Sequence, residues 1–285
     1  MTRNELARLL NLYPVDLLRA TWDLNNLHKD QAVARIVKDS PEPAILDFAA
    51  KHHPCTRQHV YLFDLASPVE NGFPSNPIGG NIAPVIRRVV GGRREYFFCV
   101  DLKFAIVLLN VPRHDHIEFK WPIFILAEDR VLQIKFTTME KDLGAYFDGA
   151  PVSVRVRSVD EKSIIQSVKE TLSPTWEPSP MDINKGIKAL WEQDFMDSPQ
   201  AQWKNAKSTT IETMDEHLMI KRERQDVYNT LVNAPLLKTQ FQVRDDESPV
   251  SRFVVDAGSG IIKFPKFSMR PEGTTDVIAK ILELN

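Results

Sequence analysis

The chain has 285 residues, of which 43% are hydrophobic and 26% charged, and its formal net charge is −2. This composition is typical of a globular protein and excludes disorder over the whole chain. The near-neutral charge excludes a protein that coats nucleic acid with its entire surface, so any such contact must come from a local basic patch. Cys55 and Cys99 are far apart in sequence, which excludes a disulfide framework or a cysteine-rich zinc site.

The N-terminal residues are polar and lack the apolar core of a signal peptide. The longest apolar stretches, near 104–111 and 122–127, are too short to cross a bilayer, which needs about 20 residues. We therefore expect an intracellular protein, located in the cytoplasm or nucleoid or in a nucleus, with no membrane partner.

Residues 1–65 are predicted to form an N-terminal helical module. Thr2 and Glu5 have the spacing of a capping box that opens a short helix. Pro14 suits the first turn of a second helix, and further helices are expected near 29–37 and 44–52. A strand near 59–65 ends the module.

Residues 66–92 are rich in proline and glycine, which predicts a connecting loop with one short strand near 85–90. Residues 93–173 are predicted to form a central β-rich domain, because β-branched and aromatic residues dominate its strands. The expected strands cover 95–111, 116–127, 131–138 and 152–159, followed by a helix at 161–172.

Three prolines mark residues 174–182 as a linker, and residues 183–285 are predicted to form a C-terminal α/β assembly unit. Helices are expected at 183–196 and 210–232, then three strands, then a helix at 274–284. This order predicts an α+β fold with a helical module, a mostly antiparallel central sheet, and C-terminal helices with a small helix-capped sheet.

Common catalytic and nucleotide-binding motifs are absent: the sequence has no G-x-x-x-x-G-K-[ST], G-x-G-x-x-G, G-x-S-x-G or H-E-x-x-H. We therefore expect no cofactor and favour a protein that is not an enzyme.

The densest basic cluster is Arg87, Arg88, Arg93 and Arg94, which bracket a Gly-Gly turn. Such a hairpin can press guanidinium groups onto phosphates or into a minor groove. The alternative is an ordinary arginine-rich hairpin whose charges are paired with local carboxylates.

Asp101, Glu118 and Lys120 have the Asp…Glu-x-Lys pattern of restriction-type nuclease folds. The two carboxylates would hold Mg²⁺ against a phosphate, and the lysine would orient or activate water. The same triplet also arises by chance on an exposed strand face.

His114 and His116 could bind zinc together with Glu118, although a polar turn after Pro112 explains them without metal, and we favour the turn. Cys55 lies among histidines and could form a cysteine–histidine nucleophile, but a buried structural thiol is the favoured interpretation.

Residues 14–38 (Pro-Val-Asp-Leu-Leu … Leu-His-Lys-Asp … Arg-Ile-Val) resemble the SAP helix–extended–helix DNA-binding element, although they have Asn-Asn where that family commonly keeps a glycine. In that family the turn and second helix contact DNA, which here implies Lys29 and Arg35. The chain also resembles the centromere protein N family in opening with a helical module, compare residues 14–22, and ending in a strand-strand-helix unit.

These patterns favour a non-enzymatic DNA-associated binding or scaffold protein within a larger complex. Arg87, Arg88, Arg93 and Arg94 are the predicted phosphate contacts, and the C-terminal unit would bind a protein partner or a second copy. Two alternatives stay open: a Mg²⁺-dependent nuclease, and a subunit that binds only protein.

Overall fold

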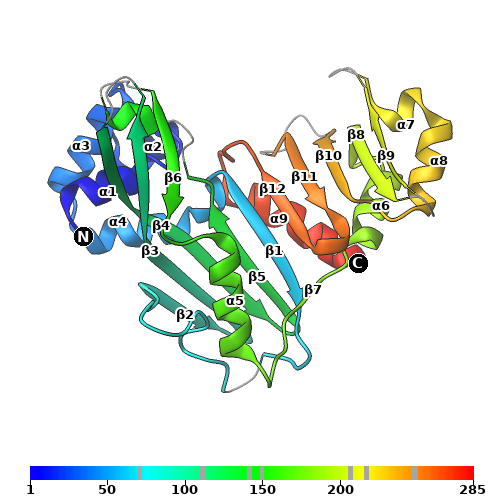
Figure 1. Cartoon of the computed structure of the whole chain (residues 1–285), viewed down its shortest axis with the longest axis horizontal. Helices are drawn as coiled ribbons and strands as arrows, with labels where there is room; N and C mark the ends of the chain where they lie inside the picture. Colours follow the sequence, from blue (N-terminus) through cyan, green and yellow to red (C-terminus); the bar gives the residue numbers. More distant parts are fainter. Residues whose placement is uncertain are drawn as a thin grey trace. The chain divides into compact units, whose positions relative to one another are not determined.

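The computed structural model describes residues 1–69, 72–109, 113–139, 143–147, 151–204, 208–214, 218–244 and 250–285. It confirms the predicted α+β fold, with antiparallel strands and helices at both ends of the chain (Figure 1). The chain divides into two compact units. Unit 1 comprises Met1–His53, Ala66–Arg130 and Phe136–Glu177, and unit 2 comprises Pro54–Leu65, Val131–Lys135 and Pro178–Asn285. These units cut across the five consecutive segments predicted from the sequence.

Four helices form the N-terminal part of unit 1: α1 (Arg3–Leu10), α2 (Val15–Trp22), α3 (Lys29–Asp39) and α4 (Glu42–Lys51). The predicted capping box is present, because the Thr2 hydroxyl accepts from the Glu5 amide and the Glu5 carboxylate accepts from the Thr2 amide. Tyr13 and Trp22 pack their rings against Phe48 of α4, which joins the helices into one cluster.

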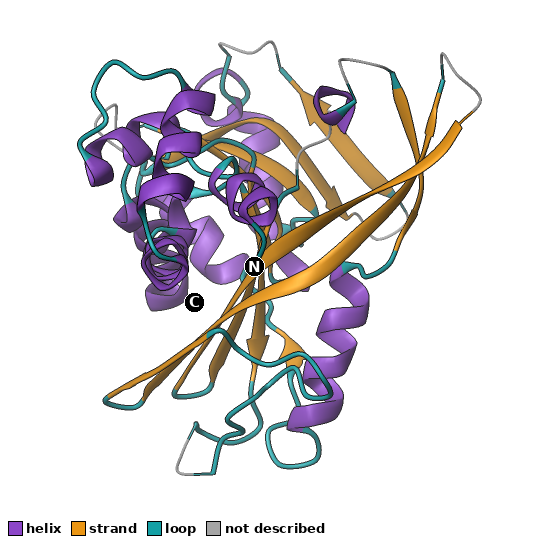
Figure 2. Ribbon diagram, turned by 90° about the vertical axis from the view of Figure 1, so that its left-hand side faces the viewer, coloured by secondary structure: helices purple, strands orange, loops and turns teal. Residues whose placement is uncertain are grey.

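The sheet of unit 1 is built on a long antiparallel hairpin. Its strands are β2 (Ile86–Val90), β3 (Arg93–Leu108), β4 (Arg113–Glu128) and β6 (Val152–Arg157), and α5 (Glu161–Leu172) follows β6. β3 pairs with β4 along its whole length, with β2 at its first half and with β6 at its second half. Figures 1 and 2 both show α1–α4 on one side of this hairpin and α5 on the other.

Unit 2 contains a second set of strands in the order β5-β1-β12-β11-β10-β8-β9, with β7 paired to β1. The bounds are β1 (Gln58–Asp64), β5 (Val131–Thr137), β7 (Ser179–Pro180), β8 (Met196–Lys204), β9 (Thr209–Thr213), β10 (Lys238–Val243), β11 (Arg252–Asp256) and β12 (Ile261–Phe264). The helices are α6 (Asn184–Glu192), α7 (Ile220–Glu223), α8 (Gln225–Asn233) and α9 (Pro271–Leu284). Short 3₁₀ turns occur at His53–Cys55, Leu143–Tyr146 and Ala257–Ser259.

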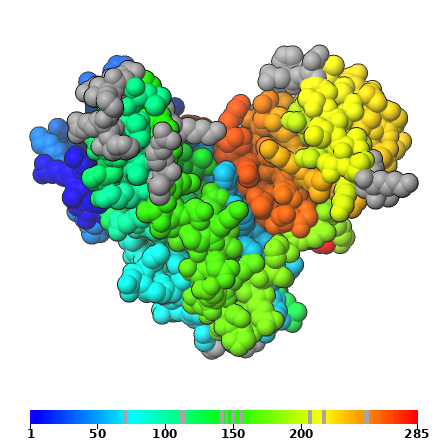
Figure 3. All heavy atoms as spheres, viewed as in Figure 1, coloured from blue at the N-terminus to red at the C-terminus, as the bar shows by residue number. Residues whose placement is uncertain are grey.

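One face of the unit 2 sheet is covered and the other is open. Trp191, Phe241, Phe253 and Phe264 are fully buried in one core with side chains of α6 and α9. In Figure 3 the strands β10–β12, in orange, form the front surface, and α9, in red, is almost completely hidden behind them. Within this unit the architecture is therefore a two-layer α/β sandwich.

The predicted helix at 210–232 is wrong at its start, where Thr209–Thr213 form the strand β9. Among the described residues that follow, helix is present at Ile220–Glu223 and Gln225–Asn233. Three of the five β9 residues are threonine and a fourth is isoleucine, and β-branched side chains favour strands. The sequence analysis predicts no strand between its helices at 183–196 and 210–232, where the structure has β8.

No helix in the described ranges is both long enough and apolar enough to cross a membrane.

Candidate nucleic-acid interface

The arginine cluster lies on the hairpin formed by β2 and β3, as the sequence predicts. Gly91 occupies the turn with a φ of +60°, a conformation that glycine adopts without strain. Val89 and Val90, which precede the turn, are 48% and 68% exposed. The end of the hairpin therefore presents apolar side chains to solvent among cationic ones.

The four arginines do not form one surface. Paired residues of an antiparallel ladder share a face, and neighbours along a strand point to opposite faces. Arg87 pairs with Tyr96 and Val89 with Arg94, so Arg87 and Arg94 share one face. Arg88 pairs with Glu95 and Val90 with Arg93, so those two arginines occupy the other face.

The second of these faces is already neutralised. Arg88 forms an ion pair with Asp47 of α4, and Arg93 Nε lies 2.8 Å from Glu95 Oε1. Half of the predicted phosphate contacts are therefore engaged with carboxylates, as the alternative interpretation of an arginine-rich hairpin expects.

One arginine of the first face differs from Arg88 and Arg93. Arg87 forms no ion pair within the described residues, and it lies close to the hydroxyl of Tyr96. That hydroxyl donates to the Pro74 carbonyl at 2.9 Å. Burial raises the pKa of Tyr96, and the nearby charges of Arg87 and Arg94 oppose this rise. Arg87 is thus the cation of the hairpin best placed to meet an external anion.

The two residues implied by the SAP resemblance have internal partners. The Lys29 ammonium donates to the Asn11 carbonyl at 2.7 Å, at the C-terminal end of α1, and Arg35 pairs with Asp39 one turn along α3. A cation at a helix C-terminus is stabilising in itself. Figure 1 shows α3 and β2 well separated within unit 1, so these residues and the hairpin do not form one patch.

The nuclease candidates do converge on one face of the β3–β4 hairpin. Asp101 pairs in register with Lys120, and Glu118 pairs with Lys103 two residues along. However, each carboxylate is bound by a lysine: Lys120 contacts Asp101, and Lys103 Nζ lies 3.0 Å from Glu118 Oε1. The arrangement is a ladder of cross-strand ion pairs, a common stabilising feature of sheets.

Lys120 is also bound from the helical side. Its Nζ lies 3.4 Å from Glu5 Oε1 of α1, while Arg8 of the same helix donates to the backbone carbonyl of Glu118. Burial alone would lower the pKa of Lys120, but its contacts with Asp101 and Glu5 outweigh burial and raise it. A raised pKa makes Lys120 less able to accept a proton, which disfavours a role as a base.

His114 and His116 lie in the strand β4, so the predicted polar turn is wrong. The side chain of His114 lies outside the described part of the structure. Among the described residues, no group of three or more histidine, cysteine, aspartate and glutamate side chains has the arrangement of a metal site. Glu118, the third predicted ligand, is engaged with Lys103.

The two thiols are poor nucleophiles. Cys55 is buried and Cys99 half-buried, and loss of solvation raises the pKa of each to about 12. Because the thiolate is the reactive species, a thiol with this pKa is almost entirely unreactive near neutral pH. The cysteine–histidine alternative therefore has no support in this geometry.

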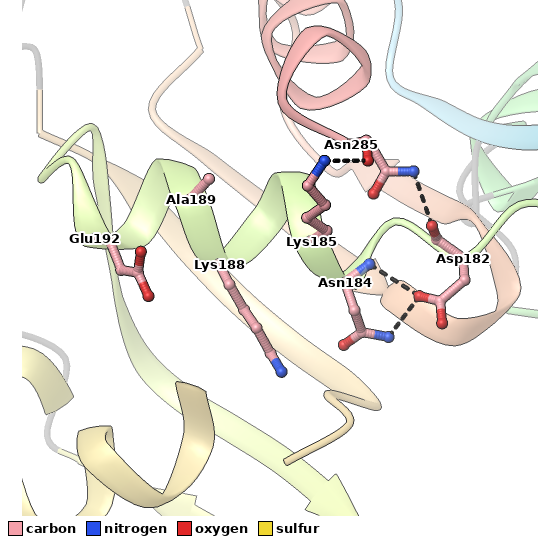
Figure 4. Close-up of a pocket in the computed structure, with 7 residues that line it drawn as sticks. All are labelled: Asp182, Asn184, Lys185, Lys188, Ala189, Glu192 and Asn285. Atoms are coloured by element: carbon pink, nitrogen blue, oxygen red, sulfur yellow. Dashed lines mark hydrogen bonds between the residues drawn. The ribbon is translucent and has the colours of Figure 1, made fainter. Parts of the chain in front are cut away.

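A depression beside α6 in unit 2 is lined by polar residues (Figure 4). Lys185 Nζ donates to the Asn285 carbonyl at 3.0 Å, and the Asn285 amide donates to the Asp182 carbonyl at 2.9 Å. Lys188 has a lowered pKa, chiefly because of burial. Asp182, Asn184, Lys185 and Asn285 hydrogen-bond one another, and the arrangement of the lining points to no particular ligand.

Comparison with known protein families, with curated proteins and with solved structures found no match.

Proposed function

We propose that the chain is a non-enzymatic binding protein that associates with nucleic acid, and that the β2–β3 hairpin contacts phosphates through the face that carries Arg87. The supporting observation is the contrast between two adjacent residues. Arg88 is paired with Asp47, whereas Arg87 forms no ion pair within the described residues. A cation without a carboxylate partner keeps its full charge for a polyanion.

The surroundings of Arg87 suit this role. Val89, which shares its face, is 48% exposed, and proteins that bind in a minor groove often place apolar side chains beside arginines. The SAP resemblance of residues 14–38 and the centromere protein N resemblance also favour DNA as the partner.

The test compares Arg87→Ala with Arg88→Ala. These variants remove the same charge from neighbouring positions, but from opposite faces of one strand. Binding to a fluorescein-labelled 30-base-pair duplex is followed by anisotropy between 50 and 200 mM salt. The slope of log K against log salt should fall in magnitude by about 0.9 in Arg87→Ala, the loss expected for one phosphate contact. Arg88→Ala should leave the slope unchanged.

Equal slopes for wild type and Arg87→Ala would overturn the proposal for this hairpin. So would equal losses in the two variants, because the effect would then depend on net charge and not on the face. Circular dichroism of each variant checks that the hairpin change leaves the fold intact.

A further inference from the structure

The open face of the unit 2 sheet carries a second set of basic and polar side chains. Register pairing places Lys263 beside Val254, Val254 beside Gln240, and Gln240 beside Gln200, so alternate residues of four strands share this face. The cations on it are Lys204, Lys238, Arg252 and Lys263, and the amides are Gln200, Gln202, Gln240 and Gln242.

The charge of this face is unbalanced. Asp256 is the one carboxylate that the described strand residues place on it, against four cations. Within the described part of the chain, none of these four cations forms an ion pair. The neighbouring Glu212 belongs to the opposite face, where it binds Arg224 at 2.8 Å. The face is therefore complementary to a polyanion.

Its shape and chemistry favour single strands over a duplex. Figure 3 shows β10–β12 forming an open surface with no helix above them, whereas duplex recognition in the major groove inserts a helix or a two-stranded ribbon. A side-chain amide both donates and accepts hydrogen bonds, as base edges do. His59 and Tyr61 of β1 join the same face through their partners Lys263 and Ile261.

The dimensions also fit. Lys263, Arg252, Lys238 and Lys204 lie on β12, β11, β10 and β8, which are consecutive in the sheet. Three strand spacings of about 4.8 Å span roughly 14 Å, the reach of a few nucleotides. A depression of about 360 Å³, lined by Gln200, Gln202, Ile211, Lys238, Gln240 and Val254, lies on this path.

We propose that the open face of the unit 2 sheet binds single-stranded nucleic acid, with its lysines and Arg252 on the phosphates and its glutamines on the bases. This proposal goes beyond the proposed role of the hairpin, because the open face lies in the other unit and would bind a different form of nucleic acid.

The experiment uses the full chain and labelled oligonucleotides dT15 and rU15, followed by anisotropy from 50 to 200 mM salt. Lys238→Gln combined with Lys263→Gln removes two charges from the open face. Lys185→Gln combined with Lys280→Gln is the matched control, because these lysines lie on α6 and α9 behind the sheet. The first pair should weaken binding at least fivefold and lower the salt slope by about 1.4, which is two single-strand phosphates.

Three outcomes would overturn the proposal: no binding of either oligonucleotide, equal losses in the two double variants, or equal competition by polyglutamate, which has negative charge but no bases. Thermal melting verifies that both double variants are folded. The two proposals can fail independently of each other. Arg87→Ala should weaken binding to the duplex and leave binding to dT15 unchanged.

Discussion

The sheets of the two units treat their charged residues differently. In unit 1, helices lie on both sides of the β3–β4 hairpin, and the charges on one face are paired: Asp101 with Lys120, and Lys103 with Glu118. In unit 2, one face is covered by helices and the other is open, and its cations Lys238 and Lys263 form no ion pair in the described structure. Paired charges stabilise the fold, whereas unpaired ones remain available to a ligand.

The burial patterns distinguish covered from solvated stretches of strand. In the first half of β3, Tyr96, Phe97 and Phe98 are buried in succession, which requires cover on both faces, whereas buried and exposed residues alternate from Val100 to Ile106. In β10, buried and accessible residues alternate from Lys238 to Val243, which is typical of a sheet with one solvated face. A strand in which apolar residues alternate with lysine and glutamine therefore indicates a sheet face that is open to solvent or to a partner.

The largest expected effect on stability comes from removing a carboxylate that is buried in unit 2. Asp197 is 1% exposed and accepts from Trp191 Nε1 at 2.9 Å and from the Ser198 amide at 2.8 Å, and it pairs with Arg244. Asp197→Ala leaves these donors without an acceptor and should cost about 3–5 kcal/mol of unfolding free energy. Urea denaturation measures this loss.

The control for Asp197 is Asp226→Ala, which breaks an exposed pair with Arg224. Exposed pairs contribute little, so its urea midpoint should match that of the wild type. Equal losses of unfolding free energy in the two variants would show that burial does not determine how much a carboxylate stabilises this unit.

A second prediction concerns both units, since each contains one shielded thiol. With pKa values of about 12, Cys55 and Cys99 should hold about one thiolate in ten thousand at pH 8. Native protein should therefore react with Ellman's reagent roughly a thousandfold more slowly than protein unfolded in urea. Because each thiol is protonated below its raised pKa, the native rate should keep rising with pH up to about 12. Rapid reaction of one thiol per molecule at pH 8 would show that one of the two cysteines is not shielded from solvent.

A third prediction addresses the layer behind the open face. A Cβ at Gly186 would lie 2.1 Å from the Ile281 carbonyl oxygen, so α6 and α9 can approach only because residue 186 is glycine. Gly186→Ala should destabilise the protein by roughly 1–3 kcal/mol through overpacking. Gly258→Ala is the matched control, because a Cβ there meets nothing within 4 Å. Similar melting temperatures for the two variants would refute this packing of α6 against α9.

The smallest effect is expected on the paired surface of unit 1. Glu118→Gln removes one exposed partner of Lys103 and should change the unfolding free energy by less than about 1 kcal/mol. Plasmid incubated with Mg²⁺ should remain intact with wild type and variant alike. Cleavage by the wild type that Glu118→Gln abolishes would restore the nuclease alternative.

Local signals in the sequence predict much of this fold. The capping box at Thr2 and Glu5, the short strand before Gly91 and the α+β order follow from spacing and composition. The helix predicted over residues 210–232 is wrong at its start, where the β-branched run at 209–213 forms β9, whereas α7 and α8 confirm helix over 220–223 and 225–233. That run was the available signal.

The candidate site was less predictable, for two reasons. Strand periodicity alone would have separated Arg87 from Arg88, because adjacent residues of a strand point to opposite faces. The partner of Arg88, in contrast, is Asp47, 41 residues away in a helix, and no local pattern indicates such a pair. The open face of unit 2 required the order of five strands before its lysines and glutamines could be recognised as one surface.

The most direct test of the central claim is a salt titration of wild-type protein with a duplex and with dT15, measured side by side by anisotropy. If the chain associates with nucleic acid, both probes should bind at 50 mM salt, and log K should fall linearly with log salt for each. Absence of binding to both probes at 50 mM salt would contradict the account.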